Sequence, residues 1–175
     1  DEIFWDEIPR MKCGRMLLEV NPVGGYEKAN AVRDIAEKTG ASLSDIIYIG
    51  DSITDVESFR LVRDHGGLAV SFNGNEYAIR EAEVAVLSSH TIIISILADI
   101  YNRYGKDQIL KLAKEWSPSS LKGICNPNLL NRLMEVYSKN PLKIELITSA
   151  NRERLMRESS AFRKTVRGEA IGRLG

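Results

Sequence analysis

Two carboxylates lie four residues apart directly after an apolar segment of the chain. Asp51 and Asp55 follow Ile46–Ile49, whose residue types are typical of a buried strand, and Gly50 ends that strand. In an open α/β sheet, ligands bind beyond the carboxyl ends of the strands, and Mg²⁺ is held there by one or two carboxylates and a phosphate. The same residues also fit a helix start with Ser52 as N-cap. This stretch alone therefore predicts a metal site and a capping arrangement equally well.

A lysine occupies the first turn of the helix expected before that strand. The helix opens at Gly24 and Gly25 and runs to about Thr39, and Lys28 lies near its start. The helix dipole favours negative charge at this end, so a lysine here suits an anion bound at the helix terminus. The ordinary alternative is a solvated surface lysine.

Helices and strands alternate along this part of the chain. Gly66–Phe72 is the second expected strand, a helix follows over Glu76–Ala82, and Glu83–Leu87 is a third strand. Asn73-Gly74-Asn75 lies between the second strand and the helix; Asn-Gly favours a hairpin, but a helical pattern comes next. The alternation predicts parallel strands joined by crossover helices.

Residues 23–87 resemble the C-terminal half of a haloacid-dehalogenase-superfamily phosphohydrolase, and most of all its archaeal phosphoserine-phosphatase-like members. Lys28 matches the lysine of the family's third motif, and Gly50, Asp51 and Asp55 match the Gly-Asp-x-x-x-Asp of the fourth. The resemblance implies a Rossmann-like, three-layer α/β fold with a partial parallel sheet and a helical C-terminal extension. It also implies Mg²⁺-dependent hydrolysis of a small phosphorylated substrate through an aspartyl phosphate.

The same resemblance implies roles for individual residues. Lys28, Asp51 and Asp55 would be catalytic, and Asp51 would hold Mg²⁺, with Asp55 holding a metal-bound water or fixing Asp51. Lys28 would offset charge on the phosphoryl group. Ser52, Asn73 and Asn75 are candidate substrate-binding residues, with no choice made between the two asparagines.

The family's first motif is missing from this chain. That motif is Asp-x-Asp after an apolar strand, and its first Asp is the nucleophile; neither it nor the second motif is recognisable here. We therefore expect a C-terminal portion of a longer polypeptide, inactive alone, whose other half, with the nucleophile, was cut away, lies on a second chain or was lost in evolution. The edge of the Ile46–Ile49 strand should be covered by that half, by another copy of the chain or by Met16–Val20 folded back.

The rest of the chain predicts a helical extension. Helices are expected over Ser89–Tyr104, Lys106–Trp116 and Asn128–Ser138, with Gly105 as a stop, and a half-exposed strand over Pro141–Thr148. The charged segment 151–175 fits a solvated amphipathic helix better than a site for an anionic partner. Residues 1–22 would form an N-terminal remnant or linker, 23–116 the core half and 117–175 the extension.

Composition limits the function classes. The chain has 24 basic and 24 acidic residues, which argues against nucleic acid as a partner. Its apolar runs are too short for a membrane span, and two distant cysteines fit a reducing, cytoplasmic setting. A non-catalytic regulatory or interaction protein that keeps the fold stays open as an alternative. A nucleotide-binding α/β module does too, although neither G-x-G-x-x-G nor a P-loop motif is present.

Overall fold

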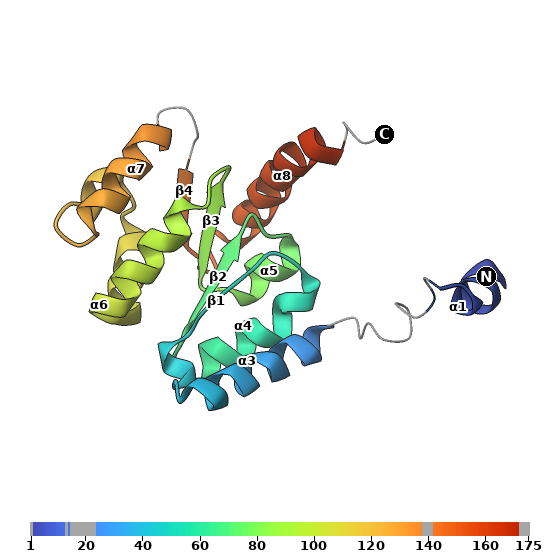
Figure 1. Cartoon of the computed structure of the whole chain (residues 1–175). Coiled ribbons are helices and arrows are strands. Elements are labelled where there is room, and N and C mark those ends of the chain that lie inside the picture. The colour runs from blue at the N-terminus through green and yellow to red at the C-terminus, as the bar shows by residue number, and fades with distance from the viewer. Residues whose placement is uncertain (1, 13, 15–23, 138–141, 172–175) are drawn as a thin grey trace.

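A computed structural model describes residues 2–12, 14, 24–137 and 142–171, and its described strands form one four-stranded sheet (Figure 1). The order in the sheet follows the chain: β1, β2, β3 and β4. β1–β3 are mutually parallel, and β4 runs antiparallel to β3. The predicted α/β class and Rossmann-like architecture are confirmed. The strands span Ile47–Gly50 (β1), Leu68–Phe72 (β2), Val84–Ser88 (β3) and Leu142–Leu146 (β4).

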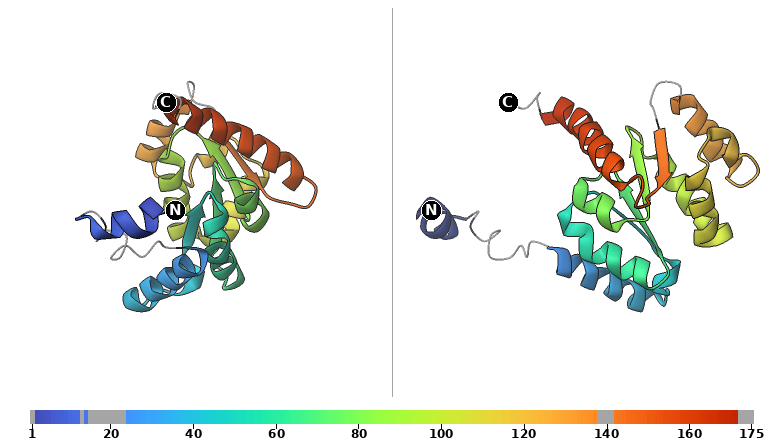
Figure 2. Two further views of the ribbon diagram at one scale, coloured as in Figure 1. Left: turned by 90° about the vertical axis from the view of Figure 1, so that its right-hand side faces the viewer. Right: turned by 180° about the vertical axis from the view of Figure 1, so that it is seen from behind.

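Helices cover both faces of this sheet (Figures 1 and 2). The α3, α4, α5 and α8 helices lie on one side, and α6 and α7 lie on the other. Their bounds are Gly25–Thr39 (α3), Val56–Asp64 (α4), Glu76–Glu81 (α5), Ile92–Lys114 (α6), Pro127–Tyr137 (α7) and Arg152–Ile171 (α8). Shorter helical turns are η1 (Ile3–Glu7), α1 (Ile8–Arg10), η2 (Leu43–Asp45), η3 (Ile53–Asp55) and η4 (Pro118–Leu121). No described helix combines the length and apolar character that a membrane crossing requires.

The alternation of side chains along β2 explains the three layers. Leu68 and Val70 pack into the larger core beneath α6, whereas Ala69, between them, packs against Phe59 of α4 and Ala78 of α5. Successive residues of a strand point to opposite faces, so a strand with apolar residues on both faces must be covered twice. β2 and β3 are buried along almost their whole length for this reason.

The crossover rule explains why α4 and α5 share a face. Each joins one parallel strand to the next in the same direction across the sheet, and right-handed crossovers then place both helices on the same side. The carboxyl ends of β1, β2 and β3 consequently lie at one edge of the sheet. That edge carries Asp51, Asn73 and Ser88.

Gly105 breaks α6, as the sequence predicts. Its backbone has φ 74° and ψ −173° inside an otherwise helical stretch, which is a conformation open to glycine. The helix is therefore divided into two segments, and both contribute to the core, through residues such as Ile96 and Ile109.

β1 lies at an edge of the sheet among the described residues, and its four residues are only partly buried. The segment Met16–Val20, which is one of the predicted covers for this edge, lies outside the described residues. At the opposite edge, β4 extends the sheet beyond β3, so part of the expected C-terminal extension belongs to the sheet itself.

Candidate active site

A pocket of about 380 Å³ opens at the carboxyl ends of β1 and β2. Its charged lining residues, among those described, come from three parts of the chain: Lys28 from α3, Asp51 and Asp55 from the turn after β1, and Arg163 from α8. The structure thus brings together the three residues predicted to be catalytic. Two cations and two carboxylates at a strand-end pocket are suited to binding and positioning a charged ligand.

Asp55 is the most tightly held of these residues, with a side chain only 6% exposed. One oxygen, Oδ1, accepts hydrogen bonds from Lys28 Nζ and Tyr48 Oη, each at 2.9 Å. The other, Oδ2, accepts from the backbone N–H groups of Asp51 and Ser52 and from the Ser52 hydroxyl, at 2.9–3.0 Å. Asp55 therefore fixes the turn after β1 and orients Lys28 at the same time.

These contacts determine the ionisation of the site. Burial alone would raise the pKa of the Asp55 carboxyl, but the hydrogen bonds from Lys28, the Asp51 backbone and Tyr48 outweigh burial and lower the pKa to about 2. Burial is the main cause that raises the pKa of Tyr48 to about 12, and the Asp55 carboxylate adds to it. At neutral pH, Asp55 is an anion and Tyr48 is a neutral donor.

Position 50 must be a glycine because Asp55 lies very close to its backbone. A Cβ atom at position 50 would lie 2.6 Å from both Cβ and Cγ of Asp55. Since the Asp55 carboxylate is held by five hydrogen bonds, it has little room to yield. The glycine that ends β1 therefore permits the compact turn that carries both aspartates.

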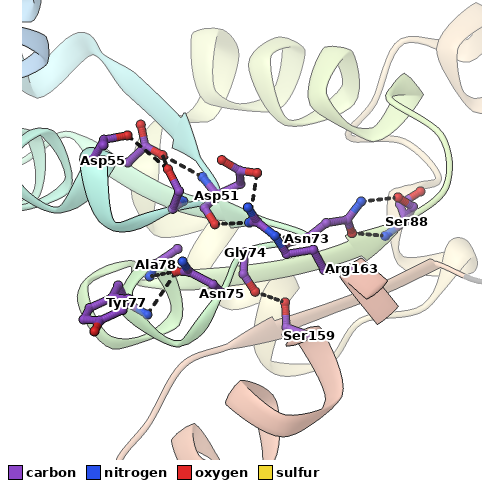
Figure 3. Close-up of polar contacts among 12 residues, drawn as sticks. Asp51, Asp55, Asn73, Gly74, Asn75, Tyr77, Ala78, Ser88, Ser159 and Arg163 are labelled. Carbon is purple, nitrogen blue, oxygen red and sulfur yellow. Dashed lines mark hydrogen bonds and ion pairs between the residues drawn. The ribbon is translucent and has the colours of Figure 1, made fainter. Parts of the chain in front are cut away.

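Lys28 and Asp51 reach the pocket with different partners. Lys28 Nζ donates to Thr54 Oγ1 and Asp55 Oδ1, both at 2.9 Å, and its side chain remains 33% exposed. Asp51 Oδ2 pairs with Arg163 Nη1 at 2.9 Å, and the same guanidinium nitrogen donates to the Asp51 carbonyl (Figure 3). Asp55 is the partner of Lys28, and Arg163 is a partner of Asp51.

The predicted substrate-binding residues bond mainly to nearby parts of the chain, as Figure 3 shows for Asn73 and Asn75. Asn73 lines the pocket at φ 49°, and its side chain donates to the Ser88 carbonyl and accepts from the Ser88 N–H, which ties the end of β2 to the end of β3. Asn75 caps α5 by accepting from the N–H groups of Tyr77 and Ala78. Ser52 donates to Asp55.

The described residues fit a metal ion only in part. They contain no group of three or more histidine, cysteine, aspartate or glutamate side chains placed to hold one. Direct coordination by Asp55 would disrupt its hydrogen bonds, which leaves Asp51 as the candidate ligand. One carboxylate is a weak site for Mg²⁺, an ion that gives up water reluctantly. Further carboxylate ligands would have to come from outside the described residues.

Arg163 is the site residue that sequence reasoning missed. It lies in the charged helix α8, which was predicted to be solvated, yet its side chain is only 17% exposed. The signal available in the sequence was helical spacing: Leu155 and Ser159 lie eight and four residues before Arg163, and both are fully buried. Arg163 continues that inward face. Phe162 and Val166, on the same helix, are half-buried and 36% exposed, respectively.

Comparisons with known proteins show which family and which proteins this chain is similar to. A family model described as haloacid dehalogenase-like hydrolase matches residues 6–102. A protein of Arabidopsis thaliana named probable trehalose-phosphate phosphatase D is 26% identical over 122 residues, which cover 67% of this chain. The solved structure of a gene product from Archaeoglobus fulgidus has a TM-score of 0.63 and 25% identity and covers 94% of this chain.

The chain is much shorter than both relatives. It spans 29% of the length of the Arabidopsis protein and 45% of the Archaeoglobus protein. The matched region of the family model contains Lys28, Asp51 and Asp55, whereas Arg163 lies beyond it.

Proposed function

Because the chain belongs to the haloacid dehalogenase-like hydrolases, we propose that it forms part of a phosphomonoester hydrolase and supplies Lys28, Asp51 and Asp55 to its active site. The observation that carries the proposal is the ion pair between Lys28 Nζ and Asp55 Oδ1, 2.9 Å apart at the pocket beside Asp51. The Arabidopsis relative, named as a probable phosphatase, supports the same class of reaction.

The proposed reaction proceeds in two displacements. A carboxylate nucleophile attacks phosphorus and forms an aspartyl phosphate while the alcohol oxygen of the substrate leaves; water then hydrolyses the acyl phosphate to regenerate the carboxylate and release inorganic phosphate. The sequence contains no Asp-x-Asp pair. The nucleophile is accordingly proposed to lie in a further segment of the same protein or on a second chain, next to β1.

Lys28 provides positive charge in this scheme. Its ammonium group faces the pocket while Asp55 and Thr54 hold it in place, so it can approach a phosphoryl oxygen without reorganising. Phosphoryl transfer depends mainly on such positioning and charge stabilisation. Asp55 acts through Lys28 and through the turn and is a positioning residue.

Magnesium dependence is part of the proposal for the complete protein. Bound Mg²⁺ would neutralise charge on the phosphoryl oxygens, and Asp51 is the described residue that would hold it. Asp51 would then exchange at least part of its contact with Arg163 for the metal. The chain alone is expected to bind Mg²⁺ weakly, because its described residues offer one suitable carboxylate.

The proposal is tested by comparing two proteins. The chain alone should not hydrolyse a generic phosphate ester, and a polypeptide that joins it to a segment bearing Asp-x-Asp should do so with Mg²⁺. A panel of phosphomonoesters that includes trehalose phosphate would then define the substrate class. Turnover by the chain alone, abolished by Asp51→Asn, would show that the nucleophile lies within it. Absence of turnover from the joined protein would favour a non-catalytic regulatory or interaction protein.

A further inference from the structure

Three side chains on one face of helix α8 hold it in place, one in the core and two at the loops beside the pocket. Leu155 is fully buried, Ser159 Oγ donates to the Gly74 carbonyl at 2.6 Å, and Arg163 Nη1 pairs with Asp51 Oδ2 at 2.9 Å (Figure 3). These residues lie four apart and therefore follow one another along the helix. The C-terminal helix consequently forms a wall of the pocket.

The guanidinium of Arg163 keeps hydrogen-bonding capacity after these contacts. Its contacts with Asp51 and Asn73 all use Nη1, so within the described part of the chain no hydrogen bond is recorded for Nε or Nη2. Arginine carries five N–H donors in a planar fork that matches the oxygens of a phosphate. Lys28 Nζ likewise uses two of its three donors.

The charges of the pocket make Arg163 more than a structural contact. Among the described residues, the charged side chains that line the pocket are two carboxylates and two cations. Lys28 lies beside Asp55, and Arg163 lies beside Asp51. Without Arg163, an incoming phosphate would meet an Asp51 carboxylate that lacks this counterion. Arg163 therefore reduces repulsion of an anion and can also donate to it.

We propose that Arg163 is a second anion-binding residue of this pocket, acting beside Lys28, so that helix α8 takes part in recognising the phosphoryl group. This inference rests on the proposed function, since it assigns a further residue to the same substrate site. It places a recognition residue in a segment beyond the region that the family model matches.

The test is binding of inorganic phosphate to the 175-residue chain, measured by titration calorimetry at neutral pH and low ionic strength. Arg163→Gln should weaken binding about tenfold or more, and Arg163→Lys, which keeps the charge, should weaken it less. Arg157→Gln is the matched control: it removes the same charge from the same helix, at a side chain 74% exposed, and should leave binding within about twofold.

A fourth variant separates the guanidinium from helix docking. Ser159→Ala removes the other polar contact of α8 with the loops and leaves Arg163 in place, so phosphate binding should stay close to that of the original chain. The inference is overturned if the original chain binds no phosphate, if Arg163→Gln binds as well as it does, or if Arg157→Gln or Ser159→Ala weakens binding equally. None of these measurements requires hydrolysis, so their result does not depend on whether the complete protein hydrolyses phosphomonoesters.

Discussion

Lys28 and Asp55, from α3 and from the turn after β1, form an ion pair 2.9 Å long in the lining of the pocket. The Asp55 side chain is almost fully buried and the Lys28 side chain is a third exposed, so the pair points a fixed positive charge toward the pocket. The same carboxylate closes the turn that carries Asp51. Folding of the turn and placement of the charge are therefore two effects of one residue.

Asp55→Asn should lower the free energy of unfolding by about 3 kcal/mol, because an amide cannot accept all five hydrogen bonds and leaves the lysine without its counterion. Urea denaturation measures the change. The matched control is Asp34→Asn, which removes an exposed pair with Lys38 and should cost less than about 0.5 kcal/mol. Equal effects of the two substitutions would contradict the importance of the Asp55 contacts.

The stability of the protein should depend on pH through Asp55. Its folded-state pKa of about 2 lies below the ordinary value of 3.8, so the carboxylate contributes stability that is fully present well above pH 3.8 and is lost as pH falls toward 2. The Asp55 carboxylate contributes about 2 kcal/mol to the free energy of unfolding at neutral pH, and about 1 kcal/mol of this is lost by pH 3. Unfolding measured at pH 6 and pH 3 should show this loss in the original chain and a smaller one in Asp55→Asn.

Gly50→Ala should destabilise the protein by about 1–3 kcal/mol, because the added methyl group would lie 2.6 Å from buried atoms of Asp55. Gly168→Ala provides the comparison within helix α8. A Cβ there meets nothing within 4 Å, and alanine favours helix, so stability should stay the same or rise by up to about 1 kcal/mol. Thermal unfolding of both variants checks the prediction, which is wrong if Gly50→Ala is neutral.

Two substitutions of Asn73 separate the effect of backbone strain on stability from the effect of the side-chain hydrogen bonds. Asn73→Gly removes the two hydrogen bonds with Ser88 but accepts the φ of 49°, whereas Asn73→Ala removes the bonds and also strains the backbone. Both should destabilise the protein, and the alanine variant should be lower in unfolding free energy by about 1 kcal/mol. If the two variants unfold alike in urea, backbone strain at this position is unimportant.

Local signals in the sequence predicted much of the fold. The strand Val84–Ser88 and the break at Gly105 follow from residue type and period, which depend on neighbours in the chain. The segment Pro141–Thr148 was also predicted as a strand. Its antiparallel position beside β3 was not predicted, because alternation identifies a strand without identifying its neighbour.

The site was predictable where a motif is local and unpredictable where it is assembled over distance. Asp51 and Asp55 share one turn, and Lys28 was found through its position at a helix start. Arg163 reaches the Asp51 carbonyl from 112 residues further along the chain. Its spacing from Leu155 and Ser159 places it on the inward face of α8, but no local pattern identifies Asp51 as its partner. The local partners of Asn75 were not predicted either, since an asparagine between a strand and a helix can cap the helix or face a ligand.

The most direct test of the central claim is the effect of Lys28→Ala on phosphate-ester hydrolysis by the protein that includes the nucleophile segment. We expect kcat/KM to fall about 100-fold or more under conditions where circular dichroism shows the variant folded. Lys38→Ala, in the same helix at a side chain 71% exposed, should keep kcat/KM within about twofold. If Lys28→Ala hydrolyses the ester as fast as the original protein does, Lys28 does not act on the phosphoryl group, and this account of the site is wrong.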